Sequence, residues 1–334
     1  MVRPQSKVLS MPLPIVLLMT AQLSAQPRRC AADDLMRHIS VISADSMMGR
    51  APGSRGDSAS AAYLTRALQE AVGTSGRVAT QDVPIGPGGK SRSRNIIATV
   101  PGTRDEWVVV TAHHDGLGVG KPDARGDSIY NGANDNAVGA ALLICVTQEL
   151  SSGPARRGVI AILTAAEERG HVGARYWAEH PTVDLTTVKF AVNLDAIGVT
   201  GPTQDFIAYG NGLLTGADSM LRAAGARAGF ELATVSFESN MYWAFDSAEM
   251  GAAGIPAVTI GMGTRRAAGP AREPAAGMPS MRERYHSPSD EVAADWDPAA
   301  IRRYADLAAS VVEAARTHTG EIRLKVPNAY QKRP

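Results

Sequence analysis

The chain has 334 residues, with 34 Lys and Arg against 33 Asp and Glu, so its formal net charge is +1. Apolar residues make up 44% and charged residues 20%, which is typical of a folded protein and excludes a disordered chain. A nucleic-acid partner recognised through a basic excess is excluded as well, and two cysteines are too few for a disulfide scaffold or a cysteine-ligated zinc module.

Residues 1–25 have the three-part plan of a secretory signal peptide. Arg3 and Lys7 give a positive start, an apolar run follows that is densest at Ile15–Met19, and small residues stand at positions 24 and 25. The run is shorter than the roughly 20 residues that cross a membrane. A disordered leader is the alternative. We expect an exported, periplasmic or secreted protein that begins near Gln26 and has no integral membrane segment.

The rest of the chain alternates between helices and strands. Helical spacing predicts helices at Asp33–Ile42, Asp57–Val72, Asn136–Leu150, Gly173–Glu179, Leu213–Ala228 and Pro298 to about Thr317. Apolar runs predict strands at Asn95–Val100, Trp107–Ala112, Val159–Thr164, Val188–Leu194, Phe206–Tyr209 and Ala257–Gly261. This order predicts an α/β fold, with a mostly parallel sheet covered by helices on both faces.

Residues 26–334 are expected to form a single domain. Only Thr264–Arg284, rich in Gly, Pro, Ala and Arg, looks inserted. Cys145 lies among apolar residues of a predicted helix, which favours a buried free thiol. A disulfide with Cys30 is the less favoured alternative in an exported protein.

Polar residues follow several of the predicted strands, where open α/β sheets bind their ligands. The histidines and carboxylates in such positions, or in nearby loops, are His113, Asp115, Asp135, Glu167, Glu168, Asp195 and His286. Each alone has an ordinary interpretation, such as packing, a helix cap, a turn or a solvated pair. Together they form a nitrogen and oxygen donor set that suits zinc, and like charges so close together would be costly without a cation.

The spacing of these residues suggests which of them bind metal and which assist catalysis. Residues two apart in an extended segment face the same way, so Asp115 can accept the second ring N–H of His113. One of Glu167 and Glu168 can bind metal while the other serves as a general base. Three carboxylates and one hydroxide balance the charge of two zinc ions, with an Asp as the natural shared ligand.

With these residues and motifs, the sequence resembles the zinc-dependent exopeptidases of the bacterial leucyl aminopeptidase and aminopeptidase Y family. The matching segments are Gly49–Ser54, Ala112–Gly118, Tyr130–Gly139, Ala166–Gly170, Asn193–Gly198, Gly254–Ala257 and Tyr285–Asp290. The likeness runs from about residue 33 to residue 315. Several motifs in order with plausible gaps make the resemblance specific.

The resemblance implies a di-zinc aminopeptidase with a three-layer sandwich fold. It implies a mixed central sheet of about eight strands. The residues at the positions of the family's zinc ligands are His113, Asp135 and Asp195 for one ion, and Asp135, Glu168 and His286 for the other. Glu167 is then the general base for hydrolysis of N-terminal peptide bonds by a zinc-bridging water, and Asp115 orients His113.

Three other functions fit the same scaffold. Relatives that cyclise N-terminal glutamine use a similar ligand set with one zinc, and carboxypeptidase-like relatives cleave from the other end. An inactive binding module would be expected to lack ligands, whereas all five are present here.

The chain departs from the family pattern in some places. Gly116 stands where many relatives have a second His, and Phe245–Ser247 replaces a Ser-Asp-His motif. The segment between Gly76 and Arg94 is too short for a protease-associated insert. The substrate pocket is expected between Leu213 and Trp243 and in the 264–284 insert, with Met241, Tyr242 and Trp243 as lining or as ordinary packing residues.

Overall fold

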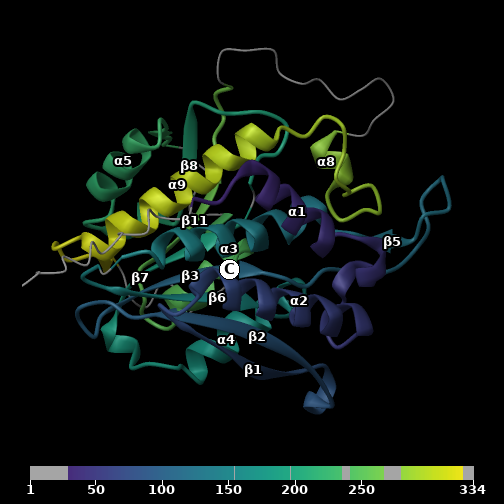
Figure 1. The fold of residues 1–334 in the computed structure, drawn as a ribbon, viewed down its shortest axis with the longest axis horizontal. Helices are drawn as coiled ribbons and strands as arrows, with labels where there is room; N and C mark the ends of the chain where they lie inside the picture. Colours follow the sequence, from purple (N-terminus) through teal and green to yellow (C-terminus); the bar gives the residue numbers. More distant parts are fainter. Residues whose placement is uncertain (1–28, 154, 196, 235–240, 267–279, 326–334) are drawn as a thin grey trace, which may run out of the picture.

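The computed structural model describes residues 29–153, 155–195, 197–234, 241–266 and 280–325. This part of the chain forms three layers, with a central sheet between two layers of helices (Figure 1). The expected signal peptide lies outside the described residues, as does most of the expected insert. None of the described helices combines the length and the apolar character that crossing a membrane requires.

The central sheet is mixed, as the resemblance implied. In the described residues it has eight strands in the order β1-β2-β6-β3-β7-β11-β8-β10. These are β1 (Arg77–Ile85), β2 (Ser91–Val100), β3 (Trp107–His113), β6 (Gly158–Thr164), β7 (Val188–Leu194), β8 (Asp205–Tyr209), β10 (Glu231–Leu232) and β11 (Ala257–Met262). Strand β3 is parallel to both β6 and β7, and β7 is parallel to β11, whereas β1, β2 and β6 pair antiparallel.

Helices cover both faces of this sheet. One layer contains α1 (Ala32–Ile42), α2 (Arg55–Val72), α3 (Val138–Leu150), α5 (Asp218–Arg227) and α9 (Pro298–Thr317), and the other contains α4 (Val172–Glu179) and α7 (Ser247–Ala252). Successive strand residues point to opposite faces. Accordingly, Ile96 and Ala98 of β2 join the core under α3 and α9, while Ile97 joins the core under α4 and α7.

Two smaller sheets and one short α-helix lie outside the three layers. The strands β4 (Gly118–Val119) and β5 (Ile129–Tyr130) form one pair, and β9 (Leu214–Thr215) and β12 (Arg323–Leu324) form another. Helix α8 (Met281–Arg284) precedes the loop that carries His286.

Besides several two-residue strands that the sequence did not predict, two longer elements differ from the predictions. Strand β1 was not predicted, because this edge strand is mostly polar and half-exposed, with no apolar run. The helix expected from Leu213 begins only at Asp218, because Leu214 and Thr215 pair with β12 and Gly216 adopts a φ of 86°. Neither difference moves a predicted site residue.

The expectation of a free Cys145 thiol is wrong. Cys145 on α3 forms a disulfide with Cys30, which precedes α1, and their Cα atoms are 5.4 Å apart. The bond joins residues 115 positions apart in the chain. It ties the start of the described chain to the central helix of one layer.

Removing this disulfide is expected to destabilise the protein. The paired Cys30→Ser and Cys145→Ser replacements should lower the free energy of unfolding by about 2–5 kcal/mol, because the unfolded chain loses a long closed loop. Denaturant unfolding of oxidised wild type and the double variant measures the difference. A reductant that left the wild-type midpoint unchanged would contradict this expectation.

Candidate metal centre

Three neighbouring parallel strands bring most of the candidate residues to one edge of the sheet. His113 is the last residue of β3 and pairs with Thr164, the last residue of β6. Glu167 and Glu168 follow β6 on a short 3₁₀ turn, and Asp195 directly follows β7. Since the carboxyl ends of β6, β3 and β7 lie side by side, these four side chains converge.

Asp135 reaches the same point from the turn that leads into α3. The backbone N–H groups of Asn134 and Asp135 donate to the Asp290 carboxylate at 2.9 and 3.0 Å. That contact fixes the Asp135 turn against the loop carrying His286. The loop is itself anchored by a buried, two-bond ion pair between Arg284 and Asp295.

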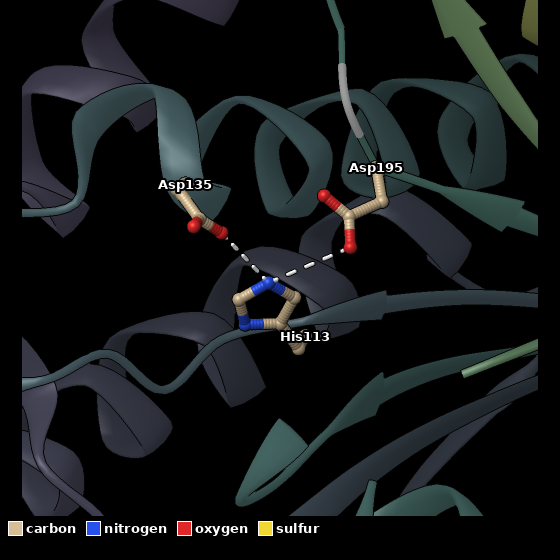
Figure 2. A group of neighbouring side chains, drawn as sticks. All are labelled: His113, Asp135 and Asp195. Atoms are coloured by element: carbon tan, nitrogen blue, oxygen red, sulfur yellow. Dashed lines mark hydrogen bonds and ion pairs between the residues drawn. The ribbon is translucent and has the colours of Figure 1, made fainter. Parts of the chain in front are cut away.

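The Asp135 carboxylate lies between the two histidines. Its Oδ1 is 3.1 Å from His113 Nε2, and its Oδ2 is 3.2 Å from His286 Nε2. Figure 2 shows the first of these contacts, with Asp195 Oδ2 3.7 Å from the same His113 nitrogen. On the other side, Glu168 Oε2 is 3.3 Å from His286 Nε2.

Two overlapping donor sets result, one of His113, Asp135 and Asp195 and one of Asp135, Glu168 and His286. Within each set, one donor atom from every residue lies within 4.8 Å of the others. Imidazole nitrogen and carboxylate oxygen are donors that zinc accepts. The residues therefore fit two cations that share Asp135.

The negative charges of the cluster also favour the binding of cations. Burial, and then the charge of Asp135, raise the pKa of Glu168 to about 7. Burial alone would lower the pKa of His113, but the surrounding carboxylates, Glu167 first, outweigh it and raise that pKa well above its usual value. Carboxylates this close repel one another, and bound cations would relieve the repulsion.

Asp115 is fully buried beside this cluster, next to His113 and the turn that carries Glu167 and Glu168. Its Oδ1 is 3.7 Å from His113 Nδ1, which is longer than a hydrogen bond. Its carboxylate instead accepts the backbone N–H groups of Glu167 at 2.9 Å and Glu168 at 3.3 Å. Asp115 therefore fixes the turn that presents both glutamates, a contact that spacing did not predict.

Replacement of Asp115 is expected to weaken metal binding. In Asp115→Asn, the amide accepts hydrogen bonds less strongly, and the Glu168 turn and His113 both lose a carboxylate neighbour. We expect zinc affinity to fall about 10- to 100-fold, measured by competition with a chromogenic chelator. Unchanged affinity would show that the carboxylate charge has no part in holding the site.

Arg50 is a second supporting residue; it lies in the matching Gly49–Ser54 segment, but the sequence did not indicate its role. Its guanidinium is fully buried and donates to the carbonyl oxygens of Ile42, His114, Asn131 and Gly132. These contacts tie the N-terminal loop to the segments that follow His113 and precede Asp135. Burial lowers the pKa of Arg50, which the nearby Asp115 carboxylate opposes.

His171 lies beside Glu167, and the buried Asp246 interacts with Glu167 electrostatically; neither is among the predicted site residues. Burial, and then the charge of Glu167, raise the pKa of Asp246 to about 7. His171 Nε2 lies 3.1 Å from Glu167 Oε1. The sequence signals are weak, because Asp246 falls in the Phe245–Ser247 segment that departs from the family pattern and His171 belongs to none of the matching segments.

The three residues expected near the pocket, Met241, Tyr242 and Trp243, have different environments. Tyr242 is completely buried and donates its hydroxyl to the Ser247 carbonyl, so it is a packing residue. Met241 is 39% exposed. Trp243 packs edge-on against Tyr242.

Comparison with solved structures shows the same fold in several enzymes. A zinc aminopeptidase from Bacillus subtilis is 15% identical with a TM-score of 0.63, covering 86% of this chain and 96% of that one. A leucine aminopeptidase precursor from Bacteroides thetaiotaomicron is 19% identical with a TM-score of 0.63, covering 86% and 98%. A glutaminyl cyclase from Porphyromonas gingivalis is 18% identical with a TM-score of 0.64, covering 84% and 97%.

One curated relative also matches in sequence. A probable zinc metalloprotease from Leptosphaeria maculans is 32% identical over 109 residues, which are 32% of this chain and 25% of that protein. The chain thus matches about a quarter of the length of that relative.

The fold and the converging histidines and carboxylates define a three-layer α/β protein with two overlapping donor sets at one edge of its central sheet. The family follows from the sequence: the model of peptidase family M28 matches residues 95–312, and the chain belongs to that family. The matched region begins in β2 and ends within α9, so it contains all seven candidate residues.

Proposed function

We propose that the protein is a zinc-dependent exopeptidase that removes residues from the N-termini of peptides. The observation that carries this proposal is the Asp135 carboxylate, which lies between His113 and His286, with Glu167 on another side of His113. Membership of a peptidase family supports the reaction class. The zinc named for the Leptosphaeria maculans relative supports the metal.

The number of zinc ions follows from the shared carboxylate. Asp135 belongs to both donor sets, and each set contributes one histidine and one further carboxylate. We therefore propose two zinc ions per chain, held by His113, Asp135, Asp195, Glu168 and His286. When bound, the ions would polarise the scissile carbonyl and acidify a water molecule.

Glu167 is placed to move the protons of this reaction. Its Oε2 lies 4.0 Å from His113 Nε2, so the carboxylate faces the donor cluster. From there it can take a proton from the attacking water and deliver it to the leaving amine. Asp115 fixes the backbone of Glu167 while this occurs.

The solved aminopeptidases that share this fold support the amino end of the peptide as the substrate end. They include the zinc aminopeptidase from Bacillus subtilis and the leucine aminopeptidase precursor from Bacteroides thetaiotaomicron.

The decisive assay compares free and blocked substrates. We expect the purified protein to hydrolyse aminoacyl-nitroanilides and not their N-acetylated forms, to lose activity on chelation, and to regain it with zinc. Cyclisation of peptides that begin with glutamine would point to a cyclase instead. Release of C-terminal residues from N-acetylated peptides would show the opposite direction of cleavage, and either result would overturn the proposal.

We also propose that the protein is exported and begins near Gln26. The Cys30–Cys145 disulfide supports this proposal, because disulfides persist in oxidising compartments. The apolar leader in residues 1–25 is consistent with that route. N-terminal sequencing of the protein recovered from a periplasmic or culture fraction tests the cleavage position.

A further inference from the structure

An imidazole lies behind the proposed general base. His171 Nε2 is 3.1 Å from Oε1 of Glu167, while Oε2 of the same carboxylate faces His113. Both side chains are largely buried, with 9% exposure for His171 and 11% for Glu167. The two oxygens of Glu167 therefore have different partners, one on each side.

The His171 ring is held from its other edge. Its Nδ1 is 3.6 Å from Oε1 of Glu249 on α7. Arg175 on α4 binds that glutamate through two hydrogen bonds of 2.9 and 3.1 Å. A chain of charged groups thus runs from Arg175 through Glu249 and His171 to Glu167.

The charge on His171 agrees with a donor role. Burial alone would lower the pKa of the ring, but Glu167 and Glu249 outweigh it, and Asp246 adds to their effect, so the pKa rises to about 10. At neutral pH the ring is then an imidazolium with an N–H on both nitrogens. Its Nε2–H can donate to Glu167, while the charged ring faces the Glu249 carboxylate at 3.6 Å.

The backbone at His171 argues against a merely structural role. The residue precedes the first turn of α4, yet its side chain makes no capping hydrogen bond. Its φ is 59°, in the left-handed region that glycine adopts without the steric cost of a side chain. Glycine would adopt this φ at a lower energetic cost if the residue only began the helix. A histidine at this position therefore indicates a function for its ring.

We propose that His171 is a positioning residue for Glu167, with Nε2–H holding Oε1 so that Oε2 faces the donor cluster. This inference rests on the proposed role of Glu167 as the proton acceptor. The residues that would hold Glu167 in place come from α4 and α7, which lie on the side of the sheet opposite α3.

Two replacements separate positioning from folding. His171→Gly removes the ring and suits the backbone, while His171→Gln keeps an N–H donor at about the same reach. For His171→Gly we expect kcat to fall about 10- to 100-fold with KM, zinc content and unfolding midpoint nearly unchanged. His171→Gln should restore most of kcat. His180→Ala, an exposed position at the end of the same helix, is the matched control.

A structural role predicts the opposite pattern. His171→Gly would then change the unfolding midpoint while kcat per folded molecule stayed at the wild-type value, and glutamine would give no rescue. Either finding overturns the proposal.

A spectroscopic measurement tests the contact without any turnover. In protein labelled at histidine nitrogens, the His171 ring N–H signal should be protected from exchange and should shift in Glu167→Gln. A signal that did not respond to Glu167→Gln would disprove the contact. If the contact is present but wild type cleaves no peptide, the proposed function fails and the positioning of Glu167 stands.

Discussion

Replacing Glu167 by glutamine is expected to lower kcat by about 100- to 10,000-fold. The amide cannot take a proton from water, although it has nearly the shape of the carboxylate. Because Glu167 is not one of the proposed zinc ligands, the variant should keep the zinc content of wild type. Steady-state kinetics on an aminoacyl-nitroanilide, with zinc counted by plasma mass spectrometry, measures both quantities.

A matched control for this experiment is Glu179→Gln, which changes an exposed glutamate at the end of α4. It should leave kcat and KM at their wild-type values. Wild-type activity in Glu167→Gln with zinc bound would mean that another group accepts the proton, and the assignment of the base would be wrong.

Replacing Asp135 by asparagine is expected to disturb both metal positions at once. The carboxylate contacts both histidines and belongs to both donor sets. We expect the zinc content to fall from two ions per chain to fewer than one, and kcat/KM to fall at least about 1000-fold, or about 4 kcal/mol of transition-state stabilisation.

Single-set replacements are the comparison that makes the Asp135 result informative. His286→Ala removes a donor from one set only, and Asp195→Asn changes only the other. Each should retain about one zinc ion per chain. If Asp135→Asn lost no more zinc than these variants, the carboxylate would not be shared between two ions.

The placement of the candidate residues follows closely from the sequence because they come directly after buried strands. The segments of β3, β6 and β7 are predominantly apolar and almost entirely buried, and His113, Glu167 and Asp195 stand at or just beyond their ends. Adjacent parallel strands end at one edge of a sheet. The convergence of these side chains is therefore predictable from the order of apolar runs and polar residues alone.

The residues that the sequence did not reveal act through long-range contacts. Arg50 binds carbonyls up to 82 positions away, and Glu249 approaches His171 only because α7 packs on α4. The same reason explains the disulfide, since Cys30 and Cys145 meet only when α1 lies along α3. Strand β1 was missed for a local reason, because an exposed edge strand has no apolar pattern.

The most direct measurement of the central claim is a crystal structure of the zinc-loaded protein with anomalous data collected on both sides of the zinc edge. We expect two zinc peaks that share the Asp135 carboxylate, one beside His113 and Asp195 and the other beside Glu168 and His286. A single peak at this site, or zinc bound only elsewhere, would contradict a two-zinc exopeptidase centre.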